Sequence, residues 1–310
     1  MRTVVYAPIV LSLVVVALSR LGIDRLQPRA AAWAVTIAGV ALSVSTVGAL
    51  VLVSCLLPAR MPVVAALGRW HPSSVALHSP VPVWSSTLAL VGLAWITWRV
   101  ARELRRLSSE LGHVVAAHAE LARHGGGEVV IVDELIPRAH ALSRTITRRG
   151  RVVVTTAMLD LLDDDERAAV VAHEHSHLRH GHGAFITVMR MASALNPLLA
   201  PMRGDLQFAL ERWADEDAAA VTHRAVIASA LAKAALAVLH VGEGTIAPAA
   251  VHLHTYAVTE RVTALLDDPA QRARLAWALL AVAAIAAASL AWAMHDTERF
   301  FEAVRLWPHP

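Results

Sequence analysis

One short stretch of the sequence holds side chains that could bind a metal ion and use it. His173, Glu174 and His177 form the pattern HExxH inside a run that predicts a helix. At about 100° per residue, His177 lies about 40° around the helix from His173 and Glu174 about 100°, so the three share one face. Two imidazoles one turn apart suit zinc, and the neighbouring carboxylate can reach a metal-bound water. The stretch therefore predicts a zinc site that activates water.

Two acidic side chains further along the sequence could complete this site. A catalytic zinc needs a third protein ligand and one open position for water. Glu211 and Asp215 stand one turn apart on a second predicted helix, so both can point at the same site. One of them could bind the metal while the other holds a ligand in position. We expect this pair to belong to the metal site and not to a solvated acidic surface.

The flanking sequence predicts the elements that position these residues. β-branched runs at residues 128–133 and 150–155 predict two strands, and residues 137–143 between them predict an edge strand. Asp163 followed by Glu166 is a capping box that begins the helix of the HExxH pattern. Further helices are expected at residues 184–200, which should be buried or graze the membrane, at 206–221 and at 225–239.

The composition places part of this chain in lipid. Hydrophobic residues make up 56% of it and charged residues 17%, and its mean hydropathy is +0.51. Soluble domains typically hold roughly 45–50% apolar and about 25% charged residues. A membrane-spanning helix takes about 20 residues. Apolar stretches near that length predict four membrane-spanning helices, at residues 4–18, 30–57, 83–100 and 275–294.

The arginines predict the orientation of these helices, because flanking segments carry more basic residues on the cytoplasmic side. Nine arginines flank one side of the four stretches and five flank the other. We therefore expect a multi-pass cell-membrane protein with three helices in residues 1–100, a cytoplasmic catalytic domain in 101–268, and a fourth helix with a short tail in 269–310. Residues 295–310 alternate apolar and charged side chains, which predicts a short amphipathic helix on the outer membrane surface.

Charge and cysteine content exclude other classes of partner and site. The formal net charge is +3, and the arginines form short clusters beside apolar runs, so we expect no direct binding to nucleic acid. The single cysteine, Cys55, lies in an apolar stretch. One cysteine excludes a disulfide framework and a cysteine-based metal site.

The order of these motifs resembles the integral-membrane gluzincin peptidases, specifically the BlaR/MecR antirepressor peptidases, with the HtpX and CAAX prenyl proteases as more distant relatives. The resemblance rests on the strand GRVVVT, the helix DDDERAAVVAHEHSHLRHGH, the turn Asn196-Pro197, the helix ERWADEDAAA and the stretch TERV at residues 259–262. Three spans before the catalytic segment and one after it also match. The resemblance implies a mainly α membrane protein with a zincin-like α+β catalytic domain, helix-rich with a small sheet, between helices three and four.

The resemblance also implies a role for each candidate residue. His173, His177 and Glu211 become the ligands of one zinc ion per chain. Asp215 becomes the partner that holds a ligand in place. Glu174 becomes the general base that takes a proton from water and returns it to the departing amine.

Further groups could assist the reaction. Arg261 of the TERV stretch either pairs with Asp215 or holds substrate. In related enzymes a histidine near this stretch hydrogen-bonds the oxyanion; spacing does not decide between His252 and His254, and we assign the role to His254. Residues 137–143 could hold an extended substrate as an added strand, since an edge strand offers free backbone groups.

Three more histidines follow the first predicted ligand. On one continuous helix His175 would lie about 200° and His182 about 180° from His173, so both should point away from the metal. His180 would lie at about 340°, on the ligand face, where it could support the site or compete for the metal.

The sequence thus predicts a membrane-embedded zinc endopeptidase that cleaves a protein. By resemblance, the substrate is a cytoplasmic winged-helix repressor of the BlaI/MecI type. Residues 295–310 leave no room for the penicillin-binding domain of the β-lactam receptors, so we expect no covalent β-lactam binding. The trigger would then be either a separate sensor partner or a signal from the membrane. Two alternatives are an HtpX-type quality-control protease, which shares the site, and a zinc-binding membrane protein without catalysis. Glu174 together with Glu211 favours a peptidase, because a carrier needs neither a general base nor a distant carboxylate.

Overall fold

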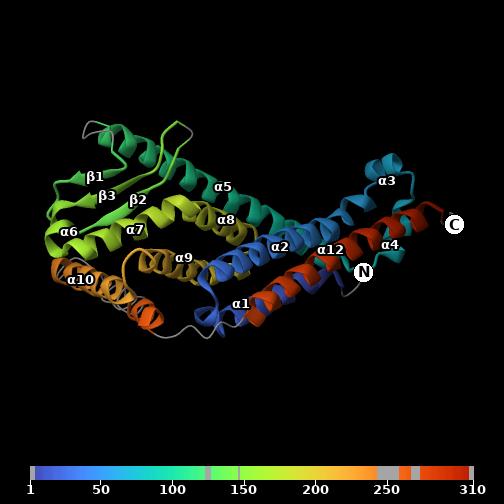
Figure 1. Ribbon diagram of the computed structural model, residues 1–310. Helices are drawn as coiled ribbons and strands as arrows, with labels where there is room; N and C mark the ends of the chain where they lie inside the picture. Colours follow the sequence, from blue (N-terminus) through green and yellow to red (C-terminus); the bar gives the residue numbers. More distant parts are fainter. Residues whose placement is uncertain (1–3, 123–126, 146, 243–257, 267–272, 307–310) are drawn as a thin grey trace.

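The computed structural model describes residues 4–122, 127–145, 147–242, 258–266 and 273–306. The molecule is elongated: long helices run along its axis, and a small sheet with shorter helices lies at one end (Figure 1). We call this part, residues 127–242 and 258–266, the sheet end. Short helices complete the chain elsewhere: η1 (Val4–Tyr6), η2 (Ile23–Arg25), η3 (Pro58–Arg60), α3 (Pro62–Gly68), α4 (Pro72–His78) and α6 (Thr156–Leu161).

Three helices form an apolar bundle: α1 (Ala7–Arg20), α2 (Pro28–Cys55) and α12 (Ala273–Leu306). Small residues let them approach closely. A side chain added at Gly48 of α2 would meet Leu290 of α12. The buried face of α2 is accordingly built from small and branched apolar residues, Ala31, Ala32, Ala34, Val35, Ala38 and Leu42.

Two described helices are long and apolar enough to cross a membrane. They occupy Pro28–Arg60 and Arg274–Leu306, where the second and fourth spans are predicted. The third becomes a candidate if Pro72–His78 and Val83–Leu121, which meet at a bend of 100°, form one broken span. The first is an apolar helix, Val4–Arg20, shorter than this test requires. Length and composition therefore support two or three of the four predicted spans.

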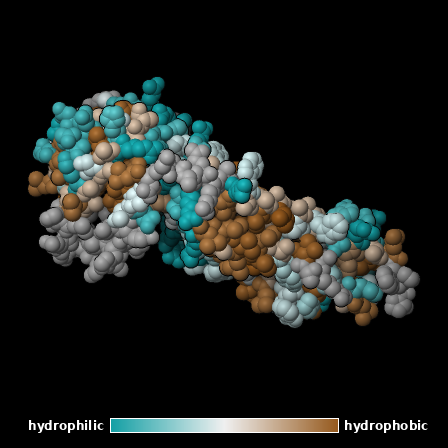
Figure 2. Space-filling model, turned by 60° about the horizontal axis from the view of Figure 1, so that its bottom comes forward, coloured by the Kyte–Doolittle hydropathy of each residue, from teal (hydrophilic) through white to brown (hydrophobic). Residues whose placement is uncertain are grey.

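The helices of the apolar bundle expose many apolar side chains. Figure 2 shows a broad hydrophobic area in the middle of the molecule, whereas the surface of the sheet end is mixed and largely hydrophilic. Soluble proteins rarely expose apolar patches of this extent. Lipid is the environment that such a surface fits. Exposed apolar side chains of the bundle helices include Val10, Leu13 and Val14 of α1 and Trp277, Ile285 and Trp292 of α12.

Helix α5 (Val83–Leu121) connects the bundle to the sheet end (Figure 1). The predicted span ends at residue 100, but no proline follows within this stretch and the helix continues to Leu121. Its polar second half is tied to α8 (His182–Leu195) by Arg190, which pairs with Glu103 and Glu110 at N–O distances of 2.6 Å. Helix α5 therefore holds the sheet end against the bundle.

The C-terminal residues do not form the separate surface helix that the sequence predicts. Neither glycine nor proline interrupts residues 273–306, and α12 continues without a break to Leu306. Its last turns pack on the α3–α4 region, where Phe301 contacts the Trp70 ring and Arg305 donates a hydrogen bond to the Gly68 carbonyl. Phe300, Phe301 and Val304 of this segment thus pack against protein, whereas Leu306 is exposed.

The sheet has three strands, β1 (Val129–Val132), β2 (Ala139–Leu142) and β3 (Arg151–Thr155), close to the predicted positions. The order is β1-β3-β2. β1 is parallel to β3, and β2 is antiparallel to β3, with Ala139 opposite Val154. The prediction that the middle segment forms an edge strand is confirmed.

Helix α7 (Asp164–His180) carries the HExxH pattern and begins at the predicted capping box. The Asp163 side chain accepts a hydrogen bond from the Glu166 amide, and the Glu166 carboxylate accepts one from the Asp163 amide. The helix ends at Gly181, whose φ of 64° lies in the left-handed region that glycine adopts without strain. The predicted helix therefore stops there, and α8 begins with a changed direction.

The turn between α8 and α9 (Met202–Ala219) packs against the bundle helix α1, with Asn196 and Leu199 buried. Asn196, at the start of η4 (Pro197–Leu199), donates hydrogen bonds to the hydroxyls of Ser12 in α1 and Thr46 in α2. Arg99 of α5 binds the carbonyls of Ser193 and Ala194, which have no partners within a helix that ends there. These bonds fix the start of α9, and α10 (Arg224–Gly242) then returns along α7.

Replacing Glu166 by Gln should destabilise the start of α7. The Glu166 carboxylate is 3% exposed and accepts hydrogen bonds from Lys233 Nζ and Ser229 Oγ, both at 2.6 Å. The amide keeps the shape but loses the charge, and we expect a loss of about 1.5–3 kcal/mol, the range for a hydrogen bond to a charged group. Thermal unfolding in detergent measures this, and Asp165→Asn, at an exposed neighbouring acid, should change stability much less.

This effect should also depend on pH. Burial raises the pKa of Glu166, but hydrogen bonds from Lys233 and Ser229 outweigh it and hold the pKa below its ordinary value. A lowered carboxylate pKa stabilises the fold above the unfolded-state pKa, and that contribution is lost as pH falls through the folded-state pKa. The difference between wild type and Glu166→Gln should be full at neutral pH and shrink below about pH 4. A difference that persists unchanged in acid would contradict the ion pair.

Candidate metal centre

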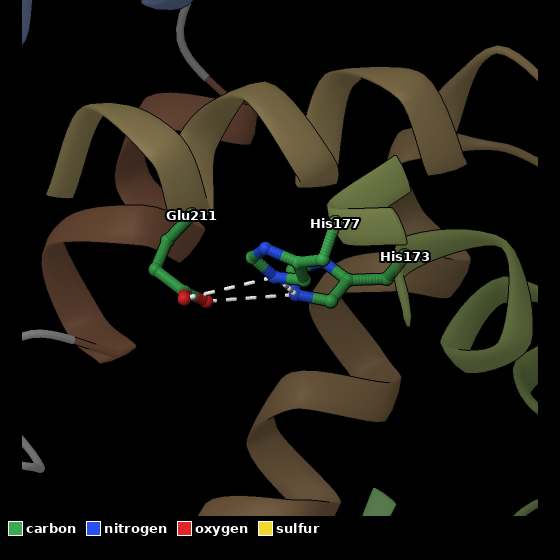
Figure 3. Close-up of side chains that lie close together, drawn as sticks. All are labelled: His173, His177 and Glu211. Carbon is green, nitrogen blue, oxygen red and sulfur yellow. Dashed lines mark hydrogen bonds and ion pairs between the residues drawn. The ribbon is translucent and has the colours of Figure 1, made fainter. Parts of the chain in front are cut away.

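Three side chains from two helices converge at the sheet end (Figure 3). His173 and His177 lie one turn apart on α7, and Glu211 reaches them from α9. The two Nε2 atoms lie 3.1 Å apart, and the Glu211 carboxylate oxygens lie 3.5 Å from His173 Nε2 and 3.7 Å from His177 Nε2. The three side chains therefore point their donor atoms at one common position.

This spacing fits a tetrahedral zinc ion. Ligand atoms at about 2.0–2.1 Å from a tetrahedral metal lie about 3.3–3.4 Å from one another. The observed separations of 3.1, 3.5 and 3.7 Å bracket that value. Two imidazoles and one carboxylate are also the donor set of catalytic zinc sites that keep a fourth position open.

Asp215 and Arg261 form a buried network with the Nδ1 side of His173. Its Nδ1 lies 2.9 Å from Asp215 Oδ1, so Nε2 is left for a metal. Asp215 is 1% exposed and accepts two hydrogen bonds from Arg261, at 2.6 and 2.8 Å. Arg261 lies in the helix at residues 258–266, and its Nη1 also approaches Glu211 at 3.1 Å. From the sequence, Arg261 could either pair with Asp215 or hold substrate; in the structure it pairs with Asp215.

The charges in this network shift one another's pKa. Burial alone would lower the pKa of His173, but its bonds to Asp215 and Glu211 outweigh this and raise it to about 9. Burial would raise the pKa of Glu211, yet the His173 hydrogen bond and the Arg261 charge lower it to about 2. Glu211 therefore stands as a carboxylate, the form that binds a metal.

His177 contacts another histidine, which helix periodicity did not predict. Its Nδ1 lies 2.8 Å from Nδ1 of His182, the first residue of α8. The expectation that His182 points away assumed one continuous helix, and the break at Gly181 overturns it. The glycine itself was the available signal, because it is a common helix-ending residue. Burial lowers the pKa of His177 to about 4 and that of His182 to about 3.

Glu174 lies beside the edge strand. Burial raises its pKa above the ordinary value, while the His173 charge and a hydrogen bond from the Ala141 backbone oppose that rise. A raised carboxylate pKa brings a group closer to neutral pH, where it both accepts and returns protons. Glu174, His173 and Glu211 line one cavity of about 240 Å³. Its other wall is mainly apolar, with Ile227, Ala230, Leu231 and Ala234 of α10 and Met158 of α6.

The remaining predicted histidines do not join the metal position. His175 Nε2 faces Glu128 at 3.4 Å, on the other side of α7. His180 Nε2 binds Asp217 Oδ2 at 2.8 Å, and its ring stacks on Trp213 at 4.5 Å between centroids. The predicted oxyanion groups, His252 and His254, lie outside the described residues.

Comparison with known families covers the middle of the chain. Residues 101–245, slightly less than half of it, match the model of Peptidase family M48. The match contains the HExxH helix and Glu211 with Asp215, but not Arg261. No solved structure matches the chain.

Curated relatives point to the same group of proteins. A "Protease HtpX homolog" of Methanothermobacter thermautotrophicus is 34% identical over 119 residues, which cover 35% of this chain and 44% of that protein. "Protease HtpX homolog 1" of Sulfolobus acidocaldarius is 35% identical over 107 residues, 32% of this chain and 34% of that protein. The chain thus spans less than half the length of these relatives. They do not support the specific antirepressor affiliation, and the central segment is similar to M48 peptidases of the HtpX kind.

Proposed function

We propose that this chain is a membrane-bound zinc-dependent endopeptidase of the M48 type. One observation carries the proposal: the donor atoms of His173, His177 and Glu211 converge at zinc spacing, with the Glu174 carboxylate beside them. The family match over residues 101–245 supports peptide hydrolysis as the reaction. The apolar surface and the long helices α2 and α12 support a membrane location.

Each residue of the site has a distinct task in this reaction. When bound by His173, His177 and Glu211, zinc supplies a Lewis acid that favours deprotonation of water and polarises the scissile carbonyl. Glu174 accepts the proton from water and returns it to the departing amine nitrogen. Asp215 keeps His173 oriented through Nδ1, and Arg261 balances the buried negative charge of Asp215 and Glu211.

The edge strand and the apolar wall define how a substrate binds. β2 pairs with β3 along one edge and also contacts α7, where the Ala141 backbone donates a hydrogen bond to Glu174. An extended peptide would add to β2 as a further strand, with its scissile carbonyl near Glu174. The apolar wall from α10 then favours an apolar side chain next to the cleaved bond.

The class of substrate follows from the relatives and not from the site. Similarity to proteases named as HtpX homologs favours a protease of the HtpX type. A cytoplasmic repressor of the BlaI/MecI type, with a separate sensor, stays a prediction that rests on sequence resemblance alone. In either case we propose that residues 101–268 face the cytoplasm as one domain, between the helices of residues 1–100 and 269–310.

Zinc binding is the first test. Purified protein should hold about one zinc per chain, and His173→Ala or Glu211→Ala should lower the zinc content sharply, because each removes one of three protein ligands. Metal analysis by mass spectrometry measures this. His175→Ala is the matched control, since it lies on the same helix but faces Glu128, and it should keep its zinc. Full zinc content in both ligand variants would refute the ligand assignment.

Glu174→Gln separates catalysis from metal binding. The amide preserves the shape of the side chain but cannot accept a proton, so zinc content should be unchanged while cleavage of fluorescent casein falls at least about 10²-fold. Activity equal to that of the wild type would remove Glu174 from the mechanism. That outcome would favour a zinc-binding protein without peptidase activity.

Reporter fusions test the orientation. Arginines are enriched near α5 and before α12, so a fusion after Arg106 should report the cytoplasm and a fusion after Arg69 the outside. Alkaline phosphatase and green fluorescent protein, which are active on opposite sides, provide the two readouts. A fusion after Arg106 that reports the outside would reject the cytoplasmic domain and a cytoplasmic substrate together.

A further inference from the structure

His182 is a buried histidine that the proposed reaction does not use. It is 1% exposed and follows Gly181, so the break between α7 and α8 turns its ring back toward α7. The ring lies edge-on to His177, with centroids 4.7 Å apart, and packs against Trp213 of α9 at 5.0 Å. Three elements therefore fix where this imidazole stands.

Only one hydrogen atom fits between the facing nitrogens of His182 and His177. Their Nδ1 atoms lie 2.8 Å apart, so one atom carries the hydrogen and the other accepts it. If His177 Nδ1 donates, its Nε2 keeps a free lone pair directed at His173 and Glu211. If His182 Nδ1 donates instead, the neutral His177 carries its hydrogen on Nε2 and cannot bind a metal there. The direction of this hydrogen bond therefore decides whether His177 can be a ligand.

Packing alone does not explain a histidine at this position. When His182 Nδ1 accepts, its own hydrogen lies on Nε2, and that atom is buried with no hydrogen-bond partner among the described residues. Burying an unpaired donor is unfavourable, and a leucine of similar size would avoid it. What a leucine would lack is the acceptor for His177.

We propose that His182 is a positioning residue that holds His177 in the tautomer with Nε2 free for zinc. It does for His177 what the Asp215 carboxylate does for His173. The proposal rests on the zinc site described above and adds a second residue that orients its ligands. Such partners of metal-bound histidines typically change metal affinity about 10–100-fold when they are removed.

Zinc affinity of the full-length protein in detergent tests this proposal. Metal-stripped protein is titrated with zinc against a chromogenic chelator. His182→Leu should bind zinc about 10–100-fold more weakly, since it removes the acceptor. His182→Asn should stay within a few-fold of the wild type, because its side-chain oxygen stands where Nδ1 stands in histidine. His180→Leu is the matched control: it changes a histidine beside Trp213 that binds Asp217, and its zinc affinity should be unchanged.

The variants also separate a positioning role from a packing role. Equal weakening in His182→Leu and His182→Asn would mean that only the fit of the ring matters, and unchanged affinity in His182→Leu would overturn the proposal directly. Where the leucine variant fails to fold, as seen by circular dichroism, His182→Ala takes its place in the same comparison. Zinc retention in His177→Ala would instead refute the ligand set itself, so the two failures are distinguishable.

Discussion

The geometry of the metal centre depends on one buried carboxylate. Asp215 is nearly inaccessible to solvent, and its oxygens bind His173 of α7 and Arg261 of the helix at residues 258–266. A buried charge without partners is strongly unfavourable, so α7, α9 and this helix must keep the arrangement that pairs it. Because Glu211 precedes Asp215 by one turn of α9, the same arrangement brings Glu211 to both histidines. The position of the third metal donor thus follows from satisfying Asp215.

The helix that carries Glu211 and Asp215 is also fastened to the apolar bundle. Arg212, the neighbour of Glu211, donates hydrogen bonds to the carbonyls of Asp24 and Leu26 between α1 and α2. Asn196, just before α9, binds α1 and α2 as well. Glu211 and Arg212, which are adjacent on α9, therefore contact the metal site and the bundle respectively.

The two histidines of the candidate metal centre are oriented by unlike partners. His173 has the charged Asp215 carboxylate, which favours the protonated ring and raises its pKa, whereas His177 has a neutral imidazole, and burial lowers its pKa. Both arrangements leave Nε2 toward the same position. In the site, His173 is held by a charged carboxylate and His177 by a neutral imidazole. The Glu174 carboxylate lies beside the edge strand, where the Ala141 backbone contacts it.

Local features of this chain were determined by sequence alone. The HExxH face, the Asp163–Glu166 capping box and the three strands each depend on neighbours within a few residues, and all appear close to their expected places. Features that depend on contacts between distant segments were decided only by the tertiary structure. Arg261 gained its partner from α9, and α5 and α12 continued past their predicted ends because other helices packed along them. The turn of His182 toward His177 follows from the left-handed Gly181, a local signal that the assumption of one continuous helix overlooks. Periodicity describes one helix at a time, whereas the directions of ligand partners depend on how helices end and cross.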